Sequence, residues 1–178
     1  DALNTVRSAK DFFFPQTENL MDFKTAGKKI EIVDTRRECE DFVVFGVRAC
    51  DVRSFDVLDK VFLAEPVDSY YKNRREHGVI VSLACTKPHE TCFCTTFGID
   101  AAAPAGDVTC WKTEDALYLE ANTEKGTALL DSLSALTADA DGKAVAKQQK
   151  ATRERMKKLP LANLTAQIRR GQDQRILR

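Results

Sequence analysis

Apolar and polar positions along the chain predict short strands that alternate with helices. Residues 42–47 form an apolar run rich in β-branched side chains, which is typical of a buried strand. Four apolar side chains then recur at helical spacing, namely Val52, Phe55, Leu58 and Phe62. We expect Asp51 to cap this helix, because a carboxylate accepts hydrogen bonds from the first turn. The pattern therefore predicts a strand, a tight turn that contains Cys50, and a helix.

A second unit of helix and strand follows the first. Residues 69–76 are polar and predict a helix, and residues 79–83 form another apolar run that predicts a buried strand. Cys85 comes just after the end of this strand. Residues 86–98 are expected to form a loop, because Pro88 and the many Thr and Cys residues oppose regular structure. Both predicted strands therefore end close to a cysteine.

The remaining segments predict a strand pair and two further helices. Residues 108–112 and 117–120 read as a β-hairpin. A helix over residues 123–136 is expected to pack its leucines into the core, Leu136 included. Residues 144–159 predict a charged helix with little apolar face, which we expect to reach outward or toward a partner.

The start of the chain predicts little regular structure. Residues 1–23 are interpreted as irregular, and a short strand is predicted over residues 29–33. The apolar run at residues 12–15 contains three consecutive Phe, which are unfavourable in water. We expect this run to pack against the main body as an anchoring arm.

The fold class that we expect is α/β, with a compact mixed or parallel sheet flanked by helices and an irregular Cys-rich loop. In such sheets ligands gather beyond the carboxyl ends of the strands. Cys50 and Cys85 would meet at that edge although 34 residues lie between them. Residues 1–138 are expected to form this domain, and residues 139–178 a helical C-terminal extension.

Composition and charge narrow the classes of function. The chain has 27 Lys and Arg against 27 Asp and Glu, so no overall field favours nucleic acid or an acidic membrane surface. No apolar run approaches the roughly 20 residues that span a bilayer. The beginning of the chain has no continuous apolar core, so we expect no signal peptide and a cytoplasmic location. No glycine-rich phosphate-binding motif supports a nucleotide site.

Four of the six cysteines form a constellation that predicts a metal site: Cys50, Cys85, Cys92 and Cys94. Four thiolates are the usual complement of a [4Fe–4S] cluster, whose separated iron corners tolerate irregular spacing. A Cys-x-Cys pair can reach two such corners from one loop, whereas it is awkward on one tetrahedral zinc ion. A structural zinc module remains an alternative, as does a redox disulfide between Cys92 and Cys94.

Other candidate side chains have simpler interpretations. Cys39 and Cys110 are expected to be small buried hydrophobic residues, the commonest role of free cysteine. His89 lies within the Cys-rich loop and is a conceivable substitute ligand, although an exposed loop histidine is the expected outcome. Arg48 and Arg53 would add positive charge beside the thiolates. We expect no catalytic residue in the chain.

Longer motifs surround the four cysteines. They are FGVRACDVRSFDVLDKVFL (45–63), DSYYKNRRE (68–76), VIVSLAC (79–85) and TCFCTTFG (91–98). These segments resemble the beta-subunit family of sulfhydrogenases and cytoplasmic nickel–iron hydrogenases, a group that includes an iron–sulfur subunit of anaerobic sulfite reductase. KDFFFPQTENLMDF (10–23) is similar to the N-terminal region of the same family. One departure is Ala49, where the family commonly has Pro.

The resemblance implies an iron–sulfur electron-transfer subunit that carries a [4Fe–4S] cluster on Cys50, Cys85, Cys92 and Cys94. Such subunits relay electrons from a flavoprotein diaphorase-type or ferredoxin-like subunit. The recipient is a catalytic subunit, which can be a hydrogenase, a sulfite reductase or a heterodisulfide reductase-like enzyme. Family members typically add two C-terminal ferredoxin modules, which this sequence lacks. The extension at 139–178 is therefore expected to lead to a missing or separate ferredoxin segment.

Overall fold

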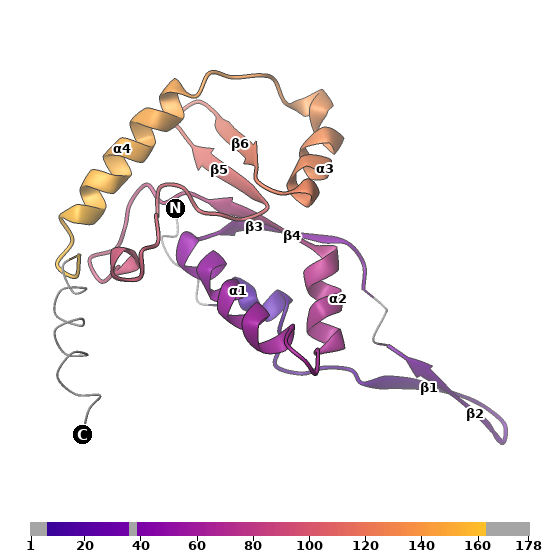
Figure 1. The fold of residues 1–178 in the computed structure, drawn as a ribbon. Helices are drawn as coiled ribbons and strands as arrows, with labels where there is room; N and C mark the ends of the chain where they lie inside the picture. Colours follow the sequence, from indigo (N-terminus) through magenta and orange to yellow (C-terminus); the bar gives the residue numbers. More distant parts are fainter. Residues whose placement is uncertain (1–6, 36–38, 163–178) are drawn as a thin grey trace, which may run out of the picture.

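The computed structural model describes residues 7–35 and 39–162 and contains a mixed four-stranded sheet with helices on both faces (Figure 1). The strand order is β3-β4-β5-β6. The bounds are Phe42–Val47 for β3, Gly78–Leu83 for β4, Val108–Lys112 for β5 and Leu117–Ala121 for β6. β3, β4 and β5 are parallel neighbours, and β6 returns antiparallel to β5. The expected α/β fold class with a mixed sheet is confirmed, as is the hairpin of β5 and β6.

The described residues contain four α-helices. They are α1 (Ala49–Phe62), α2 (Ser69–His77), α3 (Glu124–Ser132) and α4 (Lys143–Lys157). In Figure 1, α1 and α2 lie on one side of the sheet and α3 on the other, while α4 runs beside the Cys-rich loop. No helix in the described ranges is long and apolar enough to cross a membrane.

Two hydrophobic clusters occupy the two faces of the sheet. The first contains Phe13, Val44, Val47, Val52, Phe55, Tyr71 and Ile80. The second contains Val81, Val108 and Cys110, against which Leu83, Leu119, Leu129 and Leu130 pack. Ile80 and Val81 are consecutive in β4 and therefore point to opposite faces. The near-continuous apolar sequence of β4 is explained by this burial on both sides.

The N-terminal segment is more ordered than the sequence predicted. Strands β1 (Met21–Ala26) and β2 (Lys29–Asp34) form an exposed antiparallel hairpin that projects from the body (Figure 1). The strand predicted over residues 29–33 is thus confirmed. The prediction of irregular structure up to residue 23 is wrong for residues 21–23, which belong to β1. Phe13 has no exposed surface and contacts Phe55 at 4.8 Å between ring centroids, so the anchoring role is confirmed.

Helix α1 begins earlier than expected. Its first residue is Ala49, and Arg48 occupies the N-cap position without a side-chain capping bond. Asp51 is therefore not the cap, and its carboxylate instead accepts a 2.7 Å hydrogen bond from the Ser8 hydroxyl. Cys50 consequently lies in the first turn of the helix. Arg48 alone connects β3 to α1, so the separate turn that was expected to contain Cys50 is absent.

The C-terminal helices also differ from expectation. α3 ends at Ser132, and a short 3-10 helix (Ser134–Leu136) follows it and changes the angular spacing of side chains. Leu136 is 84% exposed for this reason, so its predicted inward packing is wrong. α4 buries Thr152 and Met156, and it therefore packs against the body on one face. Residues 163–178 of the expected extension lie outside the described part of the chain.

Candidate metal centre

Two of the four predicted site cysteines lie beyond the carboxyl ends of neighbouring strands. Cys50 lies just after β3, in the first turn of α1, and Cys85 follows β4 after Ala84. β3 and β4 are parallel, so their carboxyl ends share one edge of the sheet. The amide of Cys85 donates a 2.9 Å hydrogen bond to the carbonyl of Ala101, which holds this residue in an extended segment.

The other two cysteines are placed by a folded loop. The amide of Cys92 donates a 3.0 Å hydrogen bond to the carbonyl of His89, which closes a turn. Cys94 begins a 3-10 helix (Cys94–Phe97) that ends at Gly98, whose φ of 68° is left-handed. The amide of Ile99 returns to the carbonyl of Cys94 at 3.0 Å. These bonds turn the loop back on itself and bring the Cys-x-Cys pair toward the edge of the sheet.

The four thiols lie within electrostatic reach of one another. A hydrogen bond from the Cys94 thiol lowers the pKa of Cys50 to about 6. The same bond raises the pKa of Cys94, and burial and the charges of Cys50, Cys92 and Cys85 raise it further. Burial raises the pKa of Cys85, with the charges of Cys50 and Cys92 acting in the same direction. A cation beside these sulfurs would relieve the repulsion that raises the pKa of Cys85 and of Cys94.

One arginine and a helix N-terminus add positive charge beside the site. Arg48 acts to lower the pKa of Cys85 through its charge and a hydrogen bond, which opposes the larger effect of burial. The first turn of α1 carries Cys50 and adds the partial positive charge of a helix N-terminus. Cys50 is exposed, whereas Cys85, Cys92 and Cys94 are half-buried. The site is therefore held at the surface of the protein and opens toward solvent at Cys50.

Helix α4 fixes the segment that carries Cys85. The hydroxyl of Thr152 donates a 2.8 Å hydrogen bond to the carbonyl of Cys85, and Arg155 donates to the carbonyl of Thr86. Arg153 binds Asp100, farther along the loop, with bonds of 2.7 and 3.0 Å. Sequence reasoning missed these contacts. Their only signal was a Thr four residues before Met156, on the sparse apolar face of a charged helix.

The remaining candidate side chains lie apart from the four thiols or have other partners. Cys110 is completely buried within β5, as expected. Cys39 is only half-buried, and its thiol donates to the carbonyl of Glu40 at 3.5 Å, so its predicted burial is wrong. The His89 ring lies 2.8 Å from the Thr91 hydroxyl in an exposed turn. These observations leave the four predicted cysteines as the set that the fold brings together.

No group of three or more His, Cys, Asp or Glu in the described residues is placed to hold a metal ion. Zinc needs all its sulfur ligands about 2.3 Å from one point. A [4Fe–4S] cluster needs one thiolate at each of four separated corners, which is why four cysteines were expected to hold one.

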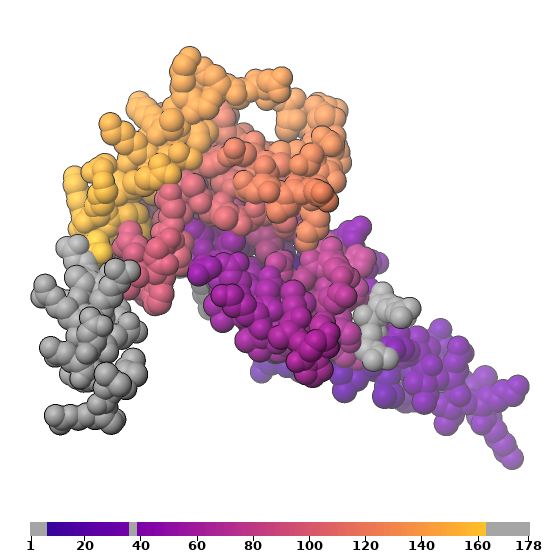
Figure 2. All heavy atoms as spheres, in the orientation of Figure 1, coloured from indigo at the N-terminus to yellow at the C-terminus, as the bar shows by residue number. Residues whose placement is uncertain are grey.

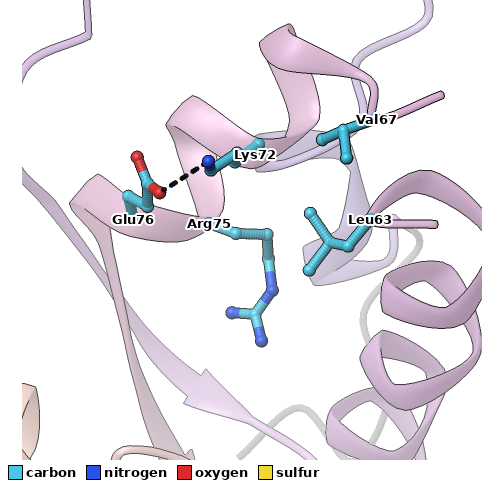
Figure 3. A pocket seen from close by; sticks show the side chains of 5 residues that line it. All are labelled: Leu63, Val67, Lys72, Arg75 and Glu76. Carbon is cyan, nitrogen blue, oxygen red and sulfur yellow. Dashed lines mark ion pairs between the residues drawn. The ribbon is translucent and has the colours of Figure 1, made fainter. Parts of the chain in front are cut away.

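A separate hollow near α2 has a structural explanation. It has a volume of about 380 Å³ and is lined by Leu63, Val67, Lys72, Arg75 and Glu76 (Figure 3). Lys72 and Glu76 form an exposed ion pair of 3.7 Å across its rim. Arg75 binds the carboxylate of Asp59 in α1 with bonds of 2.8 and 2.9 Å. Each charged group that lines the hollow therefore has a partner, and the Arg75–Asp59 pair ties α2 to α1.

Fold and site together define a class of protein: an α/β domain in which four cysteine thiols converge at the carboxyl edge of a mixed sheet. Comparison with known proteins adds a relative. The chain is 33% identical over 126 residues to sulfhydrogenase 2 subunit beta of Pyrococcus furiosus. The resemblance to hydrogenase beta subunits that the sequence motifs indicated is confirmed.

The match covers most of this chain and a minor part of the relative. It spans 71% of the chain and 36% of the Pyrococcus protein, so the chain corresponds to about a third of that protein's length. No family profile and no solved structure matches the chain. The motifs that carry the resemblance lie within residues 10–98, a range that includes the strands β3 and β4 and the Cys-rich loop.

Proposed function

We propose that this chain is an electron-transfer subunit of a multisubunit cytoplasmic oxidoreductase of the hydrogenase type. In this proposal Cys50, Cys85, Cys92 and Cys94 hold a [4Fe–4S] cluster. The protein passes electrons from a flavin- or ferredoxin-linked module to a catalytic subunit. The observation that carries the proposal is the convergence of four thiols from separate segments at one edge of the sheet. The similarity to a sulfhydrogenase beta subunit supports the same function.

When bound, the cluster supplies a site that gains and loses one electron without breaking a bond. The residues of the chain have three tasks around it. The cysteines bind as thiolates, and the N-terminal turn of α1 favours their negative charge. Arg48 donates to Cys85 sulfur and so stabilises the more negative, reduced state. Thr152 and Arg155 hold the backbone of the Cys85 segment, which limits the reorganisation that accompanies a change of charge.

Exposure of Cys50 suits a relay better than a closed catalytic site. A thiolate at the surface lets a partner approach closely without a substrate channel. His89, the histidine of the Cys-rich loop, is engaged with Thr91. These features support a carrier whose chemistry takes place in other subunits. Protons, sulfur and sulfite are all compatible terminal acceptors for such a carrier.

Anaerobic purification tests the proposal. We expect brown protein with about four irons and four acid-labile sulfides per chain and a broad absorption band that bleaches on reduction. Colourless protein with one zinc per chain would replace the proposal by a structural zinc module, which should unfold when the metal is chelated. Activity in thiol–disulfide exchange without metal would instead favour a redox pair of Cys92 and Cys94.

A further inference from the structure

Positive charge is concentrated on one helix beside the thiol site, although the chain as a whole is neutral. Six of the 15 residues of α4 are Lys or Arg, and Glu154 is its single acidic residue. Lys158 adds a further cation at the C-cap. Such a segregation of charge creates a local field that acts on partners even when the net charge of the chain is zero.

The lysines of α4 are exposed to solvent, whereas the opposite face of the helix is anchored. Thr152 and Met156 are buried against the body. Lys147, Lys150 and Lys158 are exposed and recur at spacings of three and eight, which places them on the outer side of the helix. None of these three forms an ion pair with another described residue. Their charges are therefore open to a partner, and removing them would not break an ion pair within the described chain.

The basic helix α4 lies next to the Cys-rich loop in space. A hollow of about 450 Å³ lies between them, lined by Thr95 and Ile99 from the loop and by Lys150 and Arg153 from α4. Figure 2 shows α4, in orange to yellow, as a ridge beside the pink loop and far from the β1–β2 hairpin. A 15-residue helix is about 22 Å long, so this ridge is long enough to orient a small protein.

The loop adds an apolar contact to this charged ridge. Phe93 lies between two of the site cysteines, and Phe97 is in the following 3-10 helix. Their rings are 5.8 Å apart and remain 51% and 63% exposed. Transient docking surfaces combine a few apolar anchors with surrounding charge that complements the partner. The exposed aromatic pair beside the basic helix α4 has this composition.

We propose that α4 and the Phe93–Phe97 pair form the docking surface for an acidic electron-carrier protein. The proposal rests on the function proposed above, because only a redox site gives a carrier a reason to dock there. Charge complementarity selects an acidic partner, since the ridge offers many cations and a single carboxylate. Weak redox encounters bury less than about 1,200 Å², a size that a single helix and one loop can supply.

Binding of a defined acidic probe tests this surface. The full chain is titrated with a plant-type ferredoxin by calorimetry, and with basic cytochrome c as the probe of opposite charge. Three variants are compared: Lys147→Glu/Lys150→Glu/Lys158→Glu, the same positions changed to Gln, and a control with Lys24→Glu/Lys28→Glu/Lys29→Glu on the exposed hairpin. The control changes the net charge by the same amount at the far end of the molecule. Circular dichroism of each variant verifies that the fold is kept.

We expect the α4 Glu variant to weaken ferredoxin binding by on the order of tenfold or more, with a smaller loss for the Gln variant. The hairpin control should bind like the wild type, and high salt should remove the difference because it screens surface charges. Equal losses in the α4 and hairpin variants would overturn the proposal, as would tighter binding of cytochrome c. So would binding to phosphatidylserine vesicles or RNA, lost in the α4 variant, without ferredoxin binding.

The readout separates this inference from the function on which it rests. Calorimetry detects association whether or not the chain carries iron. An iron-free chain that still binds ferredoxin through α4 would contradict the cluster and retain the docking surface. If the chain is loaded with iron and the α4 substitutions leave its affinity for ferredoxin unchanged, the cluster is retained and the docking surface is refuted.

Discussion

The hydroxyl of Thr152 lies 2.8 Å from the carbonyl oxygen of Cys85, to which it donates a hydrogen bond, although 67 positions separate the two residues. This contact joins the C-terminal helix to the segment that carries a predicted ligand. Thr152 is almost fully buried, so water does not replace the bond easily. The helix is therefore part of the support of the thiol site.

Replacing Thr152 by Val keeps the shape of the side chain and removes the hydroxyl. We expect a loss of about 1–2 kcal/mol in the free energy of unfolding, because the Cys85 carbonyl loses its partner. Hydrogen exchange should also increase in the segment that follows Cys85. Urea denaturation and exchange mass spectrometry measure these two effects. Thr127→Val is the matched control, since its hydroxyl bonds only to an exposed carbonyl at the start of α3. Equal effects of both substitutions would show that α4 does not brace the site.

Phe13 anchors the N-terminal arm in the core. Its side chain is fully buried, lies 4.8 Å from the Phe55 ring and packs under the Arg75 guanidinium at 5.6 Å. Truncation to Ala should lower the free energy of unfolding by about 3–5 kcal/mol, because the lost burial leaves a cavity. Phe12→Ala, at a position 61% exposed, should cost about 0.5 kcal/mol or less. Chemical denaturation of both variants checks the difference, and similar losses would contradict the buried anchor.

Ionisation of Asp59 makes the free energy of unfolding depend on pH. Burial acts to raise its pKa, but hydrogen bonds from Arg75 and Tyr71 outweigh burial and the pKa is lowered. A carboxylate with a lowered folded-state pKa stabilises the protein above its unfolded value of about 3.9. This stability is lost as the pH falls through the folded-state pKa. Asp59 therefore contributes fully at neutral pH and progressively less below about pH 4.

The variant Asp59→Asn isolates this contribution. It should be less stable than the wild type by about 1–3 kcal/mol at neutral pH, where the charged hydrogen bonds are complete. The difference in the free energy of unfolding between wild type and variant should become smaller as the pH falls from about 4 toward about 2, because the wild-type carboxylate is then protonated. Urea titrations across this range provide the measurement. A gap that stays constant with pH would mean that the carboxylate is not stabilised by Arg75 in the fold.

The placement of Cys50 and Cys85 at one edge of the sheet was predictable from the sequence. It follows from the local apolar pattern and from the rule that the carboxyl ends of parallel strands lie together. Two short apolar runs, each followed closely by a cysteine, become neighbouring parallel strands with their carboxyl ends together. The sequence did not reveal the start of α1. Asp51 is a good capping residue, but it bonds to Ser8, a partner 43 positions away that no local pattern indicates. Local preference was overridden by a tertiary contact.

Two other errors have different physical causes. Leu136 continues the helical spacing of the leucines before it, but the 3-10 turn at Ser134–Leu136 rotates it into solvent. The hairpin of β1 and β2 was half missed because its strands are exposed at almost every position. Burial of one face is what normally makes an alternating pattern decisive, and here that constraint is absent. Contacts of α4 with the loop were likewise invisible, since they join segments far apart in the sequence.

The iron content of single-cysteine variants, purified without oxygen, tests the central claim most directly. Cys50→Ser, Cys85→Ser, Cys92→Ser and Cys94→Ser should each lose most of the iron and the absorbance near about 400 nm, because each removes one corner ligand. Cys39→Ser, at a half-buried thiol outside the site, should keep about four irons per chain. Retention of full iron in Cys50→Ser or Cys85→Ser, or its loss in Cys39→Ser, would contradict the four-cysteine cluster.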